Sequence, residues 1–152
     1  MSRKAEIVVE ARAWLAAEPR ARSLARAAAA ATLKAEAAPP SASLVILLAD
    51  DERLRDLNSG FRGKDAPTNV LSFPTASGDD SLGDIALALG VCQREAAEQG
   101  KTLADHLQHL TAHGVLHLLG YDHETDAEAE AMESKERAIL AGLGVADPYA
   151  LR

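Results

Sequence analysis

The apolar run Leu44-Val-Ile-Leu-Leu-Ala49 is the clearest indication of the fold class of this chain. It has the length of a strand, and a continuous apolar run of that length predicts a strand buried on both faces of a sheet. Asp50 follows directly and can accept hydrogen bonds from the first amides of a helix that runs to about Leu57. A membrane helix needs about 20 apolar residues, so this run, the longest strongly apolar one, predicts no membrane span.

Strand and helix signals continue on both sides of this run. Residues 6–10 are rich in β-branched side chains, and residues 20–37 combine strong helix formers with the absence of glycine and proline. The later residues predict a loop at 58–67, a strand at 70–73, a polar turn at 75–81, a strand at 83–88, and helices at about 91–99, 102–119 and 126–140. Four strands and about five helices indicate an α+β fold: a single domain over residues 1–152, with one mixed four-stranded sheet covered by helices on one or both faces.

The composition is typical of a soluble protein from a reducing compartment, and we expect a cytoplasmic location. The only cysteine among the 152 residues is Cys92, so neither an internal disulfide nor a cysteine zinc cluster can form. The first six residues lack the apolar stretch of a secretory signal.

The net charge of −7 is uneven, because residues 1–76 carry 11 Lys and Arg against 9 Asp and Glu, and residues 77–152 carry 5 against 14. A local basic surface for a polyanion is therefore compatible with the first half.

All five histidines lie between residues 106 and 123, and three of them form a metal-binding pattern. His113 and His117 are one helical turn apart, which places their rings about 40° apart on one face. Gly120 can end the helix through a positive φ, so that His123 folds back toward the first two rings. Three imidazoles and an open fourth position are typical of a catalytic metal site, and zinc is the default ion for such ligands.

The remaining histidines and the residue after His113 leave alternatives open. His106 and His109 lie on the same helical stripe and can be ligands, partners of a ligand or polar surface. The order H-x-x-x-H-x-x-G-x-x-H also occurs in the zinc proteases called metzincins, which carry glutamate directly after the first histidine. That glutamate is the general base of peptide hydrolysis, and Gly114 stands in its place here. Peptide cleavage is therefore disfavoured.

The segment His113-Gly-Val-Leu-His-Leu-Leu-Gly-Tyr-Asp-His123 resembles the signature of the YbeY-type rRNA maturation endoribonucleases of bacteria. The stretch from Leu57 to Pro74, with its Phe-Arg-Gly-Lys-Asp-Ala-Pro-Thr-Asn core, is similar to a second characteristic block of that family. Leu82-Gly-Asp-Ile85 and Asp147-Pro-Tyr149 match as well. The resemblance covers most of residues 57–149, whereas the first 50 residues match only in the order of their elements.

This resemblance implies a metal-dependent endoribonuclease directed at single strands, acting in maturation of the 16S rRNA 3′ end and in ribosome quality control. It implies one zinc ion per chain, held by His113, His117 and His123. It also implies that Arg62 is the catalytic or RNA-positioning arginine. The partners that it implies are ribosomal RNA and the ribosome or its small subunit, with ribosome-assembly proteins as further candidates and no membrane.

Phosphodiester chemistry agrees with these assignments, because charge that develops on phosphate oxygens needs preorganised cations. Arg62 offers a planar fork for two phosphate oxygens, and Lys64 offers a further phosphate contact. The alternative is a surface arginine paired with Asp56 or Asp65. No residue clearly replaces the missing glutamate.

Two aspartates are candidates for proton transfer, Asp84 and Asp122. Asp84 can equally hold a loop or helix end, and Asp122 can orient an imidazole ligand. The attack on phosphorus can come from zinc-bound hydroxide or from the RNA 2′-hydroxyl, and the residues do not decide between them.

Two other functions compete with RNA cleavage. One is a metallohydrolase acting on another phosphoester or on a peptide. The other is a non-catalytic ribosome-assembly factor whose metal stabilises the fold.

Overall fold

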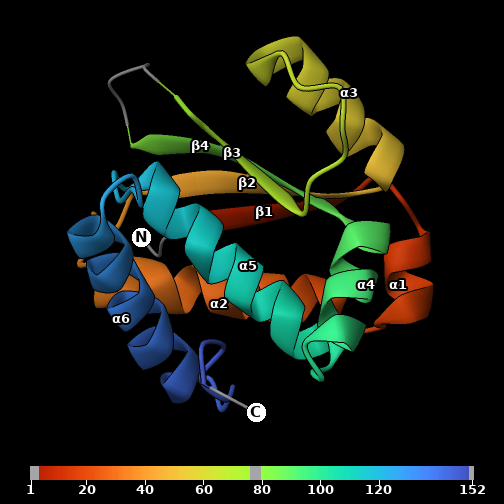
Figure 1. Cartoon of the computed structure of the whole chain (residues 1–152). Coiled ribbons are helices and arrows are strands. Elements are labelled where there is room, and N and C mark those ends of the chain that lie inside the picture. The colour runs from red at the N-terminus through yellow and green to blue at the C-terminus, as the bar shows by residue number, and fades with distance from the viewer. Residues whose placement is uncertain (1–3, 76–79, 151–152) are drawn as a thin grey trace.

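A four-stranded sheet forms the framework of the protein, and helices pack on both of its faces (Figure 1). The computed structural model describes residues 4–75 and 80–150. The elements in chain order are β1 (Lys4–Val9), α1 (Ala13–Ala17), α2 (Ala21–Ala35), β2 (Ser43–Ala49), α3 (Asp51–Arg62), β3 (Val70–Pro74), β4 (Ser81–Ala88), α4 (Leu89–Glu98), α5 (Leu103–Leu118) and α6 (Asp126–Gly142).

The sheet has the order β1-β2-β4-β3, with β1, β2 and β4 parallel and β3 antiparallel to β4. Ile46 of β2 lies between Ile7 of β1 and Ile85 of β4, so the apolar run predicted as a strand is central in the sheet. The α+β class and the mixed four-stranded sheet are thereby confirmed. No helix within residues 4–75 and 80–150 has the length and hydropathy needed to cross a membrane.

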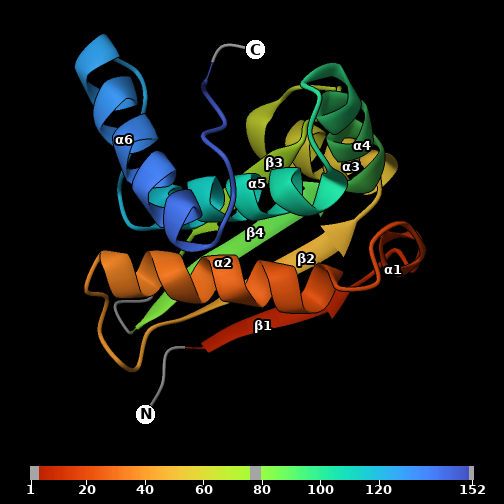
Figure 2. The same cartoon turned by 90° about the horizontal axis from the view of Figure 1, so that it is seen from below.

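One face of the sheet is covered by α2 and α5, which lie side by side across it (Figure 2). The small side chains of α2 let the helix approach the sheet and α5 closely. Its buried positions include Ala21, Ala25 and Ala29. This alanine-rich packing compensates for the low content of aromatic residues. The one tryptophan, Trp14, is fully buried, and its indole nitrogen donates to the Ala49 carbonyl at 2.8 Å.

The opposite face is only partly covered, which corrects the expectation that β2 is buried on both faces. Leu44, Ile46 and Leu48 are buried, whereas Val45 and Leu47 are half-buried. The reason is that α3 contacts β3 and β4 but makes no comparable contact with β2 among the described residues. Figure 1 shows α3 on the side of the sheet opposite α5.

Two further expectations about helices need correction. The described residues contain six helices rather than about five, because the short α1 carried no clear signal in five residues. The helix after Asp50 runs through Arg62, so the first part of the loop predicted at 58–67 is helical. Asn58 is buried there, and its side-chain amide donates to the Ala66 carbonyl at 2.9 Å, which offsets the poor helix propensity of Gly60.

The other boundaries agree with the sequence predictions to within a few residues, apart from the polar turn predicted at 75–81, most of which lies outside the described residues. The two long C-terminal helices begin with side-chain caps. Thr102 accepts a hydrogen bond from the Asp105 amide, and Thr125 forms a reciprocal capping box with Glu128. These caps set where α5 and α6 begin, and so which side chains they present to the histidine cluster.

Candidate active site

Helix α5 and the loop after it bring the three predicted metal ligands together. His113 and His117 lie one turn apart on α5, and the distance between their Nε2 atoms is 3.0 Å. Gly120 adopts a φ of 103° just after the helix, and the chain then turns so that the His123 ring centroid lies 5.1 Å from that of His117. One nitrogen from each ring lies within 4.8 Å of the others.

Hydrogen bonds on the far side of two rings orient them for a shared ion. His117 donates from Nδ1 to the Tyr121 carbonyl at 3.0 Å, and His113 donates from Nδ1 to the Glu136 carboxylate at 3.2 Å. Both Nε2 atoms are then unprotonated and face each other, an arrangement that is repulsive unless a cation lies between them. A tetrahedral zinc ion with bonds of about 2.0–2.1 Å separates two nitrogens by about 3.3 Å, so the donor set fits this metal.

The electrostatic surroundings favour the neutral, metal-binding form of His117. Burial lowers its pKa below the ordinary value, and the neighbouring His113 and His123 rings lower the pKa further, because protonated rings this close together would repel one another. A neutral imidazole is the form that ligates metals.

The position of the missing protease glutamate is closed by packing. Gly114 is buried, and a Cβ there would lie 3.1 Å from two carbon atoms of the Ile85 side chain. Helix α5 therefore rests directly on β4 at this point. A glutamate at 114 would point into the sheet, which is consistent with the absence of a peptidase base.

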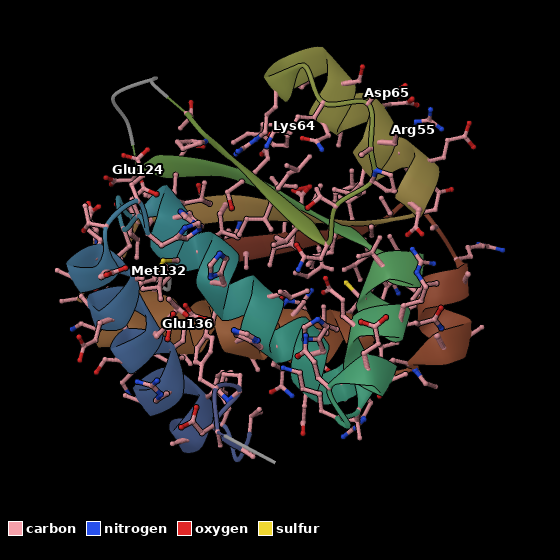
Figure 3. The ribbon with its side chains drawn as sticks, viewed as in Figure 1. Arg55, Lys64, Asp65, Glu124, Met132 and Glu136 are labelled. Carbon is pink, nitrogen blue, oxygen red and sulfur yellow. The ribbon has the colours of Figure 1, made fainter. Side chains whose placement is uncertain are left out.

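A cleft of about 640 Å³ runs beside the histidines. One side is formed by the end of α3 and the following loop, including Arg62 and Lys64, and the other by the three histidines with Asp122 and Glu124. Figure 3 shows Lys64 coming from the α3 side and Glu124 from the loop between α5 and α6. The structure thus brings the predicted cations and the predicted ligands to one cleft.

Arg62 is exposed and has no ion-pair partner among the described residues. The alternative pairing with Asp65 is not observed, because Asp65 accepts two hydrogen bonds from Arg55, at 2.7 and 3.1 Å. Figure 3 shows Arg55 and Asp65 together on the other side of α3. The Arg55 guanidinium also lowers the pKa of the Asp65 carboxyl. Arg62 is therefore available to an anion in the cleft.

The two candidate aspartates lie in different places. Asp122 lines the cleft, and its carboxylate accepts a hydrogen bond from the His123 amide at 2.8 Å. Asp84 pairs with Phe73 across the β3–β4 ladder, so both side chains lie on one sheet face, and both line a separate pocket with Phe61. The neighbouring Ser72 points to the other face, where its hydroxyl donates to the Gly114 carbonyl. Asp84 is not brought to the histidine cluster.

The two remaining histidines stay outside the three-ring cluster. His106 is buried, and its Nε2 lies 2.8 Å from a Glu95 oxygen. His109 lies 2.6 Å from an oxygen of Glu136, and the other oxygen of that carboxylate contacts the candidate ligand His113.

Glu136 of α6 is the site residue that sequence reasoning missed. It is 1% exposed, and its carboxylate contacts His109, His113 and Tyr149. Burial alone would raise its pKa, but the hydrogen bonds from these three partners lower the pKa to about 2. The sequence signal that could have identified Glu136 is its position on the apolar stripe of a charged helix, four residues after Met132 and three before Ile139.

The chain is similar to proteins of one known family. The family model described as "Endoribonuclease YbeY" matches residues 8–144. A protein named Endoribonuclease YbeY from Rhodopseudomonas palustris is 50% identical over 157 residues, covering 95% of this chain and 80% of that protein. One of the same name from a Bradyrhizobium species is 48% identical, covering 97% of this chain and 92% of its own length.

A solved structure shares the fold. The solution structure of TM1509 from Thermotoga maritima superposes with a TM-score of 0.61, covering 97% of this chain and 99% of that chain. The two sequences are 23% identical. The mixed sheet with its helices is therefore a fold already seen in another protein.

Proposed function

The chain belongs to the Endoribonuclease YbeY family and is an endoribonuclease, and on that premise we propose that it cleaves single-stranded regions of ribosomal RNA with a zinc ion held by His113, His117 and His123. The observation that carries this proposal is the cleft that the three imidazoles line together with Arg62, which has no ion-pair partner among the described residues. The proposal treats residues 1–152 as one catalytic domain.

Zinc, when bound by the three imidazoles, supplies a Lewis acid that polarises an oxygen in the cleft. Side chains of the protein bind the phosphates. Arg62 binds the non-bridging oxygens of the phosphate through its planar fork, and Lys64 binds a neighbouring phosphate as a point charge. The absence of a described carboxylate partner for Arg62 supports this role, because no internal salt bridge must break before phosphate binds.

Asp122 is the candidate for proton transfer or for ordering the ligand loop. Its carboxylate lines the cleft and already accepts the His123 amide, which favours holding that loop in shape. Asp84 has no part in the proposal because its side chain lies in the pocket with Phe61 and Phe73. The reaction products distinguish the two routes of attack, since the RNA 2′-hydroxyl leaves a 2′,3′-cyclic phosphate and water does not.

The precursor of the 16S rRNA 3′ end is the substrate that we propose, together with a role in ribosome quality control. The family resemblance supports this choice of substrate. On the same ground we propose that the protein acts in the cytoplasm on the small ribosomal subunit, with assembly proteins as further candidate partners. The uneven charge of the chain supports docking of RNA phosphates at the α3 side, where Arg62 and Lys64 lie, rather than at the acidic loop side.

The test compares the parent with His117→Ala and Arg62→Ala on a precursor RNA with a single-stranded 3′ tail, with zinc content measured by elemental analysis. Arg62→Ala should keep its zinc and its melting temperature and lose about 10²–10³-fold in cleavage rate. Arg53→Ala is the matched control, because Arg53 lies on the same helix and pairs with Glu10 outside the cleft.

Three outcomes would contradict the proposal. Unchanged cleavage by Arg62→Ala refutes the role of Arg62, and unchanged zinc content in His117→Ala refutes the ligand set. A parent protein that binds zinc and RNA without cleaving it would favour an assembly factor whose metal is structural. Casein and a chromogenic phosphodiester are tested alongside. Cleavage of either one with the RNA left intact would identify a metallohydrolase with another substrate.

A further inference from the structure

A network of side chains centred on one buried carboxylate lies directly behind the candidate metal ligands. Glu136 is at its centre, between α5 and α6 (Figure 3). One carboxylate oxygen lies 2.7 Å from the Tyr149 hydroxyl and 2.6 Å from His109 Nε2, and the other lies 3.2 Å from His113 Nδ1. The carboxylate thus has a described partner on each oxygen.

The donors and acceptors of this network are consistent with only one tautomer of His113. An ionised carboxylate accepts hydrogen bonds and cannot donate, so His113 must carry its proton on Nδ1. Its Nε2 is then a bare lone pair, and that atom faces His117 Nε2 at 3.0 Å. His109 fits the same scheme, because it donates from Nε2 to Glu136 while its Nδ1 lies 3.5 Å from the Lys101 ammonium.

The C-terminal segment fixes the direction in which this carboxylate points. Asp147 accepts hydrogen bonds from the Tyr149 amide at 2.9 Å and from Arg137 Nε at 3.3 Å, which shapes the turn that carries Tyr149. The Tyr149 hydroxyl then holds one oxygen of Glu136, so the other faces His113. This gives a physical role to the Asp147-Pro-Tyr149 segment, which lies outside the cleft.

We infer that Glu136 is a positioning residue of the metal centre, which holds His113 in its metal-binding tautomer and orientation and is itself aimed by Tyr149. The inference rests on the proposed metal site and adds to it a second layer that reaches α6 and the C-terminal segment. A carboxylate behind a metal-bound imidazole is a recurrent device that also raises the basicity of the ligand.

Packing alone does not explain the presence of an ionised group at this position. Glu136 is 1% exposed and lies on the same helix face as Met132 and Ile139, where an apolar side chain would fill the space without desolvating a charge. What an apolar side chain cannot do is accept the proton of His113 Nδ1. The need for an acceptor is the feature that distinguishes positioning from packing.

Glu136→Gln separates the two roles because it keeps the size and removes one acceptor. With its amide nitrogen toward His113, the glutamine requires an unprotonated Nδ1, which moves the proton to Nε2 and blocks the metal. With its oxygen toward His113, the amide instead faces the Tyr149 hydroxyl and His109, whose Nδ1 is already committed to Lys101. Neither orientation satisfies all partners.

The first experiment measures zinc affinity by competition with a chelator. Glu136→Gln should bind zinc about 10–100-fold more weakly than the parent, and Tyr149→Phe should show a smaller loss because His109 still holds the same oxygen. Thr111→Val is the control, since Thr111 is buried on α5 and its hydroxyl bonds, within the described part of the chain, only the Leu107 carbonyl of its own helix. It should lower the melting temperature without changing zinc affinity.

A folded Glu136→Gln protein with the parent's zinc affinity would overturn the inference. The second experiment needs no variant and therefore does not depend on whether Glu136→Gln folds. Nitrogen-15 NMR of the metal-free parent should show the proton of His113 on Nδ1, and a proton on Nε2 would overturn the inference equally. If the parent binds no zinc, the proposed metal site is refuted instead. The tautomer of His113 then still shows whether Glu136 holds the proton on Nδ1.

Discussion

Removing one imidazole from the cluster tests the metal site through protein stability. His117→Ala deletes one of three ligands and also the hydrogen bond from Nδ1 to the Tyr121 carbonyl. We expect the parent to be stabilised by zinc and the variant to have lost most of that stabilisation.

The size of the zinc effect follows from mass action. A ligand present at 100 times its Kd stabilises the folded state by about 2.7 kcal/mol, and each kcal/mol shifts the melting temperature by about 2–4 °C in a domain of roughly this size. Zinc at that excess should therefore raise the melting temperature of the parent by about 5–11 °C. Two remaining imidazoles bind far more weakly, so the same zinc concentration should shift His117→Ala by less than about 2 °C.

The assay is thermal unfolding with and without zinc, followed by circular dichroism. His106→Gln is the matched control, because His106 is a buried histidine of the same helix that contacts Glu95 and stays outside the cluster. It should melt at a lower temperature and keep the full zinc-induced shift. An equal zinc shift in His117→Ala and the parent would refute the assignment of His117 as a ligand.

The remaining predictions concern other parts of the fold. Gly83→Ala should destabilise the protein by about 1–3 kcal/mol or more in denaturant titrations. The reason is that the φ of 137° is strained for alanine and that a Cβ would lie 2.2 Å from the Phe73 carbonyl oxygen. Unchanged stability of the variant would contradict this packing. Burial lowers the pKa of His106 below that of an unperturbed histidine, which is about 6.5. The unfolded chain therefore binds a proton first, and stability should fall as the pH drops below about 6.5, less steeply in His106→Gln; equal slopes would be evidence against the neutral buried ring. Burial also raises the pKa of the Cys92 thiol, so Cys92 should react with a thiol reagent at neutral pH only on unfolding, and rapid labelling of the native protein would refute its burial.

The sequence alone was sufficient for features that depend on local geometry. The spacing of His113 and His117 places two rings on one helix face whatever the helix packs against, and Gly120 provides the positive φ that turns the chain toward His123. Strand and helix signals are equally local, which is why the four strands and the long helices were found within a few residues of their observed bounds.

Contacts between distant segments were outside the reach of these patterns. Helix α3 continues past Asn58 because that side chain bonds a loop carbonyl eight residues on, a contact that no propensity encodes. The sequence leaves Asp84 as a candidate for the site. Only the pairing of β3 with β4 shows on which face of the sheet its side chain lies. A shift of one residue in register would have reversed that outcome.

The three histidines, the cations and the elements that carry them can be recognised from sequence patterns, because residues separated by a few positions have few possible arrangements. Arg62 and those histidines are brought to one cleft only by the folded chain, with no described carboxylate partner for Arg62. Likewise, only the packing of α6 shows that Glu136, one of many carboxylates on that helix, holds His113 from behind. The physical reason is that these contacts depend on how α3 and α6 dock on the sheet and on α5. That docking is set by the burial of whole helix faces rather than by any one residue.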